Sequence, residues 1–312
     1  MRKIWLFCVI PALAFSAPRE LSRFEYRQVQ MGIVARLVLY APDEVAARVA
    51  ASAAFARVAL LDSIMSDYRP ESELMRLAAS SGGPPVPVSA ELFDVVSRAQ
   101  SLSRASDGSF DITVGPLVRL WREARRTGAL PTEAARGHAL SRVGWRHVHL
   151  DPVARSIRLD RPEMLLDLGG IAKGYAAQEA VRTLAEHGVT RALVEMGGDI
   201  VAGAPPPGER GWRVAIDHPG DAPASILLAH AALSTSGDTE QFVEIGGVRY
   251  SHVVDPATGV GLRNRSAATV LAPDGATADA LSTLLTVLDP AHGRALLASL
   301  YPGVTAWVRT VE

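Results

Sequence analysis

The sequence predicts an α+β fold that is rich in strands and carries its helices on the outside. Apolar residues recur at helical spacing in the first part of the 312-residue chain, but from about residue 144 their period shortens toward two. In a doubly wound protein with a parallel sheet, helices and strands alternate regularly. This sequence does not show that alternation. Because the chain contains no internal repeat and no long linker, we expect residues 17–312 to form a single domain.

Apolar spacing and turn residues indicate the individual elements. Pro42–Asp43 marks the start of a first helix that runs to about residue 65, and a second helix starts near Ser89 and stops before Asp107–Gly108. Strands are expected at 145–150, 156–159, 164–168, 191–196, 212–217, 225–231, 267–271 and 304–309, and a hairpin over 241–254 turns at Gly246–Gly247. Later helices are expected up to Gly188, around Asp279, and over residues 290–300.

Charge excludes some classes of partner. The 32 Lys and Arg residues balance 33 Asp and Glu residues, which leaves a net charge of −1 at pH 7. A chain without a net positive field has no general attraction to nucleic acid or to an anionic membrane. We therefore expect neither of these as the main partner.

The first residues have the pattern of a secretory signal peptide. Met1–Lys3 is basic, and the apolar run of residues 4–15 is too short to span a bilayer. Small residues predict cleavage after residue 16, so that Ala17 becomes the N-terminus; the alternative is an uncleaved anchor. Cys8, the only cysteine, lies inside the apolar run and is not placed as a lipid attachment site. We therefore expect a periplasmic protein that is not a lipoprotein and needs no disulfide.

Asp279 and Thr283 are spaced to share one face of a predicted helix. A carboxylate in an apolar helix is costly unless it is paired or binds a cation, and Mg2+ prefers oxygen ligands. The spacing therefore indicates half of a Mg2+ site. The alternative is structural: the Thr283 hydroxyl would bond back to the carbonyl of residue 279, and Asp279 would serve the helix start.

Asp167 ends a predicted strand, and Gly169–Gly170 and Lys173 follow it at the start of a helix. Backbone amides at such a turn attract an anion, and Lys173 adds a positive charge. The segment is not a Walker A loop, because its lysine precedes the glycine and Tyr175 stands where Ser or Thr would bind Mg2+. The alternative is a tight turn without a ligand.

Further polar clusters lie at 109–116, 195–199, 234–238 and 250–256, and each taken alone is typical of a turn. The last of them holds His252, which taken alone is more typical of a structural residue than of a catalyst. Arg119, Arg122 and Arg126 share a helix face that we interpret as solvated; the alternative is a surface that binds a partner.

Together these segments resemble the ApbE family of FAD:protein FMN transferases, in which they occur in the same order. The resemblance covers roughly residues 25–310 and rests on the segments 66–74, 110–117, 167–175, 195–199, 234–238, 250–259 and 278–283. It implies an ApbE-like, T-fold-related fold with mixed, largely antiparallel sheets and helices packed outside. It also implies Mg2+-dependent transfer of FMN from FAD to a threonine or serine hydroxyl of an exported redox protein, with release of AMP.

The resemblance also implies where FAD and Mg2+ bind. FAD would contact Met31, Tyr68, Ser109, Phe110, Asp111, Asp167, Lys173 and Val253. The metal ligands would be the carbonyl of Gly170 and the side chains of Asp279 and Thr283. Lys173 and His252 would be catalytic: the lysine offsets pyrophosphate charge, and the histidine orients or deprotonates the acceptor hydroxyl.

The chain departs from the family pattern at several points. Ile33 follows Met31–Gly32 where the family commonly has threonine, and Thr239 stands where an aromatic residue is frequent. Residues 122–126 replace the usual glycine and aromatic after Trp121. Two other activities would use the same site: a Mg2+-dependent FAD pyrophosphatase that yields FMN and AMP, and a non-catalytic periplasmic flavin carrier.

Overall fold

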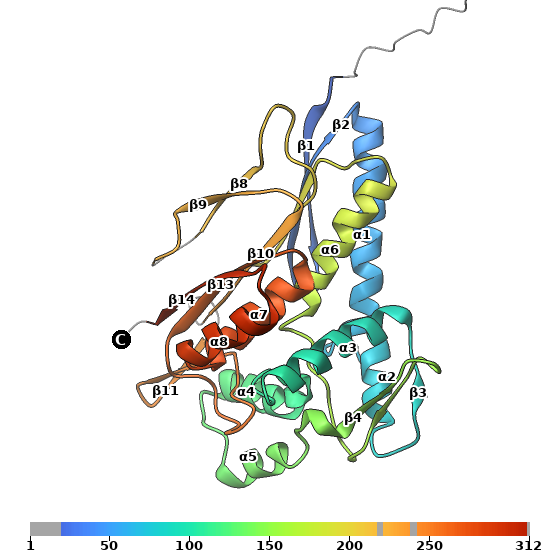
Figure 1. Ribbon diagram of the computed structural model, residues 1–312. Coiled ribbons are helices and arrows are strands. Elements are labelled where there is room, and N and C mark those ends of the chain that lie inside the picture. Colours follow the sequence, from blue (N-terminus) through green and yellow to red (C-terminus); the bar gives the residue numbers. More distant parts are fainter. Residues whose placement is uncertain (1–19, 217–220, 238–241, 311–312) are drawn as a thin grey trace, which may run out of the picture.

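The computed structural model describes residues 20–216, 221–237 and 242–310 (Figure 1). The predicted signal peptide, residues 1–16, lies outside the described residues, as does Thr239. A seven-stranded sheet forms the centre of the described chain, and each neighbouring pair of its strands is antiparallel, which confirms the predicted fold class. In spatial order the strands are β1 (Ser22–Gln30), β2 (Ile33–Ala41), β6 (Ala192–Met196), β7 (Asp199–Ala202), β10 (Ala231–Gly237), β13 (Ser266–Ala272) and β14 (Thr305–Thr310).

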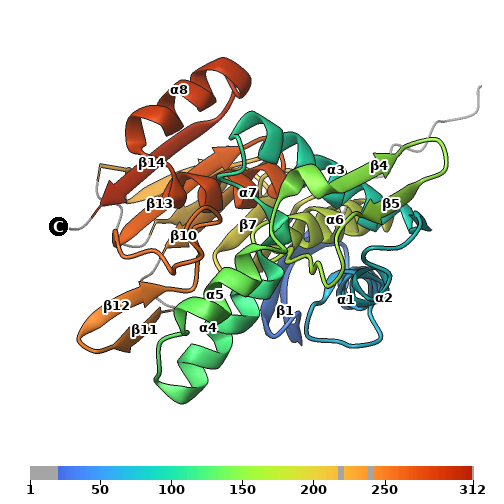
Figure 2. The same ribbon diagram turned by 90° about the horizontal axis from the view of Figure 1, so that it is seen from below.

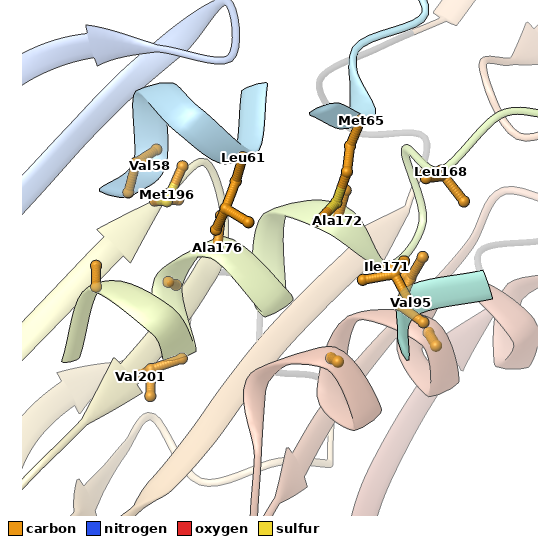
Figure 3. Close-up of a cluster of buried hydrophobic side chains, with 14 of the residues drawn as sticks. Val58, Leu61, Met65, Val95, Leu168, Ile171, Ala172, Ala176, Met196 and Val201 are labelled. Atoms are coloured by element: carbon orange, nitrogen blue, oxygen red, sulfur yellow. The ribbon is translucent and has the colours of Figure 1, made fainter. Parts of the chain in front are cut away.

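Three long helices, α1 (Glu44–Met65), α6 (Ala172–Glu186) and α7 (Gly275–Val287), cover one face of this sheet (Figure 1). Asp43 caps α1 by accepting a hydrogen bond from the Ala46 amide at 2.8 Å. Small side chains on the buried faces of α1 and α6 let the two helices approach closely. Side chains from α1, α6, β6 and β7 meet in one buried cluster (Figure 3), among them Val58, Leu61, Ala176, Met196 and Val201.

The other face of the sheet is covered in part by a hairpin of β8 (Trp212–Ala215) and β9 (Ser225–Leu228). Trp212 packs on Tyr40 of β2 with ring centroids 5.8 Å apart, and its indole N–H donates to the Ala204 carbonyl at 3.0 Å. Successive side chains of a strand point to opposite faces of the sheet, so Tyr40 lies on the face away from the long helices. There it joins Trp212 in a second, smaller apolar cluster.

Four further helices lie at the lower end of α1 in Figure 1. They are α2 (Glu73–Ala79), α3 (Ala90–Ala105), α4 (Gly115–Thr127) and α5 (Glu133–Leu140), with the small sheet β3 (Val86–Pro87), β5 (Ser156–Leu159) and β4 (Val148–Asp151). Short 3-10 turns span Ile112–Val114 and Trp145–His147. A hairpin of β11 (Phe242–Ile245) and β12 (Val248–Ser251) lies beside α4 (Figure 2), where Tyr250 packs on Trp121 with centroids 5.0 Å apart.

Several predicted elements are confirmed within a residue or two. The first helix spans residues 44–65, the hairpin turns at Gly246–Gly247, and α8 (Pro290–Leu300) has the predicted bounds. Asp289 caps α8, and Pro290 occupies its first turn, where a missing amide proton costs nothing. Each of these elements is indicated by residues that lie within it or directly beside it in the sequence.

Other predictions are wrong. Met164 and Leu166 are buried as expected, but the structure assigns no strand to residues 164–168; the Asp167 amide donates to the Ile112 carbonyl at 2.7 Å. Residues 234–237 lie inside β10 and not in a turn, because β7 and β13 pair with β10 on either side. Strands β1 and β2 had no counterpart in the sequence prediction.

Candidate active site

A cavity of about 720 Å³ lies where the helices meet one end of the large sheet. This volume falls within the roughly 300–1,000 Å³ that small-molecule sites commonly have. Of the site residues predicted from the sequence, Asp279 alone is absent from the lining. The others line the wall: Met31, Tyr68, Ser109, Phe110, Asp111, Asp167, Gly170, Lys173, His252, Val253 and Thr283.

Met31 reaches the cavity from the two-residue turn between β1 and β2. Its φ is 51° and that of Gly32 is 75°, the left-handed pair that a tight hairpin turn needs. Ile33, the departure from the family pattern, lies close to the β6–β7 turn: a Cβ on Gly197 would lie 3.0 Å from its Cδ1 atom. Its side chain therefore packs between the two turns and does not offer a hydroxyl to a ligand.

Tyr68 is 74% exposed, and its ring is covered by the guanidinium of Arg122 at 4.0 Å from the ring centroid. Arg122 also pairs with Asp67 and, at 3.3 Å, with Asp167. Burial raises the pKa of Asp167, and the charge of Asp67 raises it further, whereas Arg122 opposes both effects. The solvated face expected for Arg122 is therefore wrong: this departure from the family places a cation in the cavity wall.

Asp111 is buried, and its carboxylate is used within the protein. It accepts hydrogen bonds from the Thr113 amide at 2.8 Å, the Thr113 hydroxyl at 2.7 Å and the Trp145 amide at 2.9 Å. Burial raises its pKa against the effect of these donors. Asp111 therefore fixes the loop that carries Ser109 and Phe110, and this loop forms one wall of the cavity.

Lys173 lies in the first turn of α6 among acceptor oxygens. Its Nζ is 3.0 Å from Asp199, 3.3 Å from both carboxylate oxygens of Asp279 and 3.1 Å from the Gly169 carbonyl. Burial alone would lower the pKa of Lys173, but the two carboxylates outweigh it and raise that pKa above its usual value. Burial and the charge of Asp279 raise the pKa of Asp199 to about 7. The lysine is therefore held as a fixed positive charge.

Asp279 stands behind Lys173, only 1% exposed, because α6 and α7 cross at two glycines. A Cβ on Gly174 would lie 2.1 Å from the Gly275 carbonyl oxygen, so only glycine allows this approach. The Gly174 amide donates to Asp279 at 3.0 Å. The helix N-cap is Asp274, which accepts from the Thr277 amide, so Asp279 does not serve the helix start.

Thr283 lies one turn further along α7, beside Gly170. A Cβ on Gly170 would be 3.1 Å from the Thr283 hydroxyl oxygen. This hydroxyl contacts Ser236 at 3.1 Å, and it is Ser282 that donates to the Asp279 carbonyl, at 2.9 Å. The structural alternative predicted for Thr283, a bond back to residue 279, is therefore wrong.

The predicted metal ligands fit a hard divalent cation by their chemistry. A carboxylate, a hydroxyl and a backbone carbonyl are all oxygen donors, and an ammonium already lies against the carboxylate, so the site favours positive charge. Within residues 20–216, 221–237 and 242–310 there is no cluster of three or more His, Cys, Asp or Glu side chains suited to a metal. A cation beside Asp279 would therefore have to be held by the carboxylate, hydroxyl and carbonyl oxygens together.

His252 follows β12 at the exposed side of the cavity. The next residue, Val253, is held by its amide, which donates to the Ser251 hydroxyl at 3.1 Å. An imidazole that borders both the cavity and solvent is accessible to a second macromolecule. No helix in the described part of the chain is long and apolar enough to cross a membrane.

Sequence reasoning missed residues that act only through tertiary contacts. Asp199 pairs with Lys173, and the hydroxyls of Ser234, Ser236 and Ser282 lie between Asp199 and Thr283. The polar clusters that hold Asp199 and the two β10 serines were visible in the sequence. What the sequence did not show was that β7 and β10 bring them to one place.

The cavity beside the antiparallel sheet is lined by aromatic, lysine and carboxylate groups, a combination suited to a ligand that carries both a ring system and phosphate. The ApbE family model matches residues 31–308. A FAD:protein FMN transferase of Treponema pallidum is 33% identical over 307 residues, covering 92% of this chain and 84% of that protein. One from Salmonella typhimurium is 35% identical over 236 residues, covering 73% and 67%.

Solved structures agree with this relationship. The flavinyl transferase ApbE of Pseudomonas stutzeri, in its apo form, superposes with a TM-score of 0.81 at 31% identity, over 94% of this chain and 92% of that one. The flavin transferase ApbE of Vibrio cholerae gives a TM-score of 0.79 at 29% identity, over 93% and 94%. The chain belongs to the ApbE family.

Proposed function

We propose that this chain transfers the FMN half of FAD to a threonine or serine hydroxyl of an acceptor protein, with Mg2+ and with release of AMP. Membership of the ApbE family and relatives named FAD:protein FMN transferase support flavin transfer. One observation supports it for this chain: Lys173, Gly170 and Thr283 line the same cavity as Tyr68 and His252, with Asp279 directly behind.

In the proposed reaction the acceptor hydroxyl oxygen forms a bond to the flavin-side phosphorus. The bond from that phosphorus to the AMP oxygen breaks, and AMP leaves with the electron pair. His252 takes the hydroxyl proton, since it borders both the cavity and solvent. Lys173, kept protonated by Asp199 and Asp279, offsets negative charge on the pyrophosphate.

The metal-binding part of the proposal assigns a role to each oxygen donor. The carboxylate of Asp279, the hydroxyl of Thr283 and the carbonyl of Gly170 would hold Mg2+, which supplies charge neutralisation on the pyrophosphate when bound. Lys173 and a cation compete for Asp279, because the ammonium is 3.3 Å from both of its oxygens. Asp199, 3.0 Å from Lys173, would leave the ammonium a second partner if Asp279 held a cation.

The test is a transfer assay with the mature protein, FAD, Mg2+ and an exported redox protein as acceptor. We expect flavin fluorescence that stays with the acceptor on a denaturing gel and is lost in the Asp279→Asn variant. AMP released at the same rate with and without acceptor would instead identify a pyrophosphatase. Tight FAD binding without any AMP over hours would identify a flavin carrier and refute the proposal.

We also propose that the chain is exported, with residues 1–16 removed in the periplasm and residues 17–312 acting as one domain. The basic start and short apolar run support export. N-terminal sequencing of the protein from a periplasmic extract should begin at Ala17. An intact Met1 on protein retained with the membrane would refute cleavage.

A further inference from the structure

A row of hydroxyl groups connects the buried carboxylate of Asp199 to Thr283 at the cavity wall. Ser234 donates to Asp199 at 2.6 Å and contacts Ser282 at 3.0 Å. Ser282 contacts Ser236 at 2.8 Å, and Ser236 contacts Thr283 at 3.1 Å. These serines come from β10 and α7, which pack face to face. The row therefore ends on a predicted metal ligand.

The direction of these hydrogen bonds follows from counting protons, since each hydroxyl has only one to donate. The Asp279 carbonyl can only accept, and it lies 2.9 Å from the Ser282 hydroxyl. Ser234 has its proton on Asp199, so it too can only accept from Ser282. The Ser282 proton therefore points away from Ser236, whichever of the two acceptors it uses.

The direction of the Ser282 proton also fixes the donors of the next two hydrogen bonds in the row. Because Ser282 offers Ser236 only its oxygen, Ser236 donates to Ser282 and has no proton left for Thr283. Thr283 must then donate to Ser236. Its own oxygen keeps its lone pairs for the cavity, and a hydroxyl that donates a hydrogen bond is a better acceptor and ligand.

We propose that Ser236 and Ser282 are positioning residues that turn the Thr283 oxygen toward a bound divalent cation. The inference rests on the proposed function, in which Thr283 is a metal ligand. It adds that the ligand strength of this neutral oxygen depends on Ser236, which also lines the cavity, and on Ser282, which does not. Ser282 is fully buried on α7 and absent from the cavity lining, so it orients the Thr283 hydroxyl through Ser236 and not by contact with a ligand in the cavity.

The test measures metal binding directly, with Mn2+ as a spectroscopic probe of the oxygen site. Free Mn2+ is followed by electron paramagnetic resonance during titration of the mature protein and its variants. We expect Ser236→Ala and Ser282→Ala to weaken Mn2+ binding by about tenfold each, the scale of lost partners around metal ligands. The control is Thr235→Ala, because Thr235 lies between the two β10 serines but bonds to Thr269, at 3.0 Å.

A double-mutant cycle separates positioning from general structural damage. In a Thr283→Val background, Ser282→Ala should cause no further loss, because the group that it orients is gone. An equal loss in both backgrounds, or none in either, would overturn the inference. If Ser282→Ala does not fold, Ser236→Ala in the same two backgrounds gives the same test.

The same titrations distinguish an error in the proposed metal site from an error in the orienting role of the serines. If the unmodified protein binds no Mn2+, or if Thr283→Val binds it as tightly as the unmodified protein, the metal assignment itself is wrong. If Thr283→Val weakens binding while the Ser282→Ala and Ser236→Ala variants do not, the metal site stands and only the orienting role is overturned.

Discussion

Replacing Gly174 with alanine should separate the helices that carry the two charged groups of the site. The new Cβ would lie 2.1 Å from the Gly275 carbonyl oxygen and 2.8 Å from the Asp279 Cβ atom. Real Cβ atoms are essentially never closer than 3.0 Å to such neighbours, so α6 and α7 must part by about 0.9 Å, the difference between 3.0 and 2.1 Å. The neighbours are backbone atoms of Gly275 and a Cβ atom, whose position the backbone fixes, so no flexible side chain can move instead.

The cost has two parts. Overpacking a close contact costs about 1–3 kcal/mol. Parting the helices also weakens the hydrogen bond from the Gly174 amide to the Asp279 carboxylate, which contributes about 1.5–3 kcal/mol as a bond to a charged group. We therefore expect a loss of about 3 kcal/mol or more, which for a chain of this size lowers Tm by about 5 °C or more.

Thermal unfolding by circular dichroism gives Tm, and Mn2+ titration reports whether Asp279 still meets its partners. Gly137→Ala is the matched control: Gly137 lies inside α5, where a Cβ would find nothing within 4 Å. Alanine there should stabilise the protein by about 0.5–1 kcal/mol, since it replaces glycine in a helix. A Gly174→Ala protein with unchanged Tm and unchanged Mn2+ affinity would refute the claim that this crossing positions Asp279.

Three further predictions concern charged groups in the cavity wall and directly behind it. Asp279→Asn should keep the fold but lose the rise in Tm that Mg2+ gives the unmodified protein, as measured by thermal shift. The unfolding free energy of the metal-free protein should fall as pH rises from about 4 to 7, because Asp199 binds its proton more tightly when folded, with a pKa of about 7; urea titrations should show this slope absent in Asp199→Asn. Arg122→Gln should raise the pKa of Asp167 further, since the charge of Arg122 is the largest of the effects that lower it, so FAD binding followed by fluorescence should weaken more at pH 6 than at pH 8.

Each of these predictions has an outcome that contradicts it. The metal assignment fails if Asp279→Asn keeps the full Mg2+-induced shift in Tm. The role given to Asp199 fails if its asparagine variant has the same pH slope as the unmodified protein. For Arg122, an equal loss of FAD affinity at both pH values would show that the guanidinium acts by packing on Tyr68 and not through Asp167.

Local signals account for what the sequence predicted well. The first helix follows from apolar spacing after Asp43, and the last from Asp289 followed by Pro290. The i, i+4 spacing of Asp279 and Thr283 is likewise fixed by helix geometry alone. Each of these features is complete within one short stretch of chain, so no knowledge of the fold was needed.

The features that sequence reasoning missed depend on contacts between distant segments. Arg122 looks solvated on its own helix, and only the fold brings Asp67 and Asp167 against it. Ser234 and Ser236 look like turn residues, but in β10 their hydroxyls find partners on α7. Small polar residues are acceptable inside a sheet when a neighbouring element satisfies them.

The order of strands in the large sheet has a consequence for how the protein acquires its site. Met31 comes from the first hairpin, but β2 of that hairpin pairs with β6, where Leu37 faces Val194. The opposite wall comes from β10 and α7, so the cavity is lined by residues from 31 to 287. Pairings over such long sequence separations form slowly, because the chain must close large loops first.

Binding therefore requires nearly the whole chain. A nascent polypeptide that ends before α7 has Tyr68, Lys173 and Asp199 but lacks both Asp279 and Thr283. In the proposed function such a chain would lack two of the three metal ligands, however well its first helices have formed. If the proposed site is right, the order of the elements along the chain delays the reaction until α7 has been made and has packed against β10.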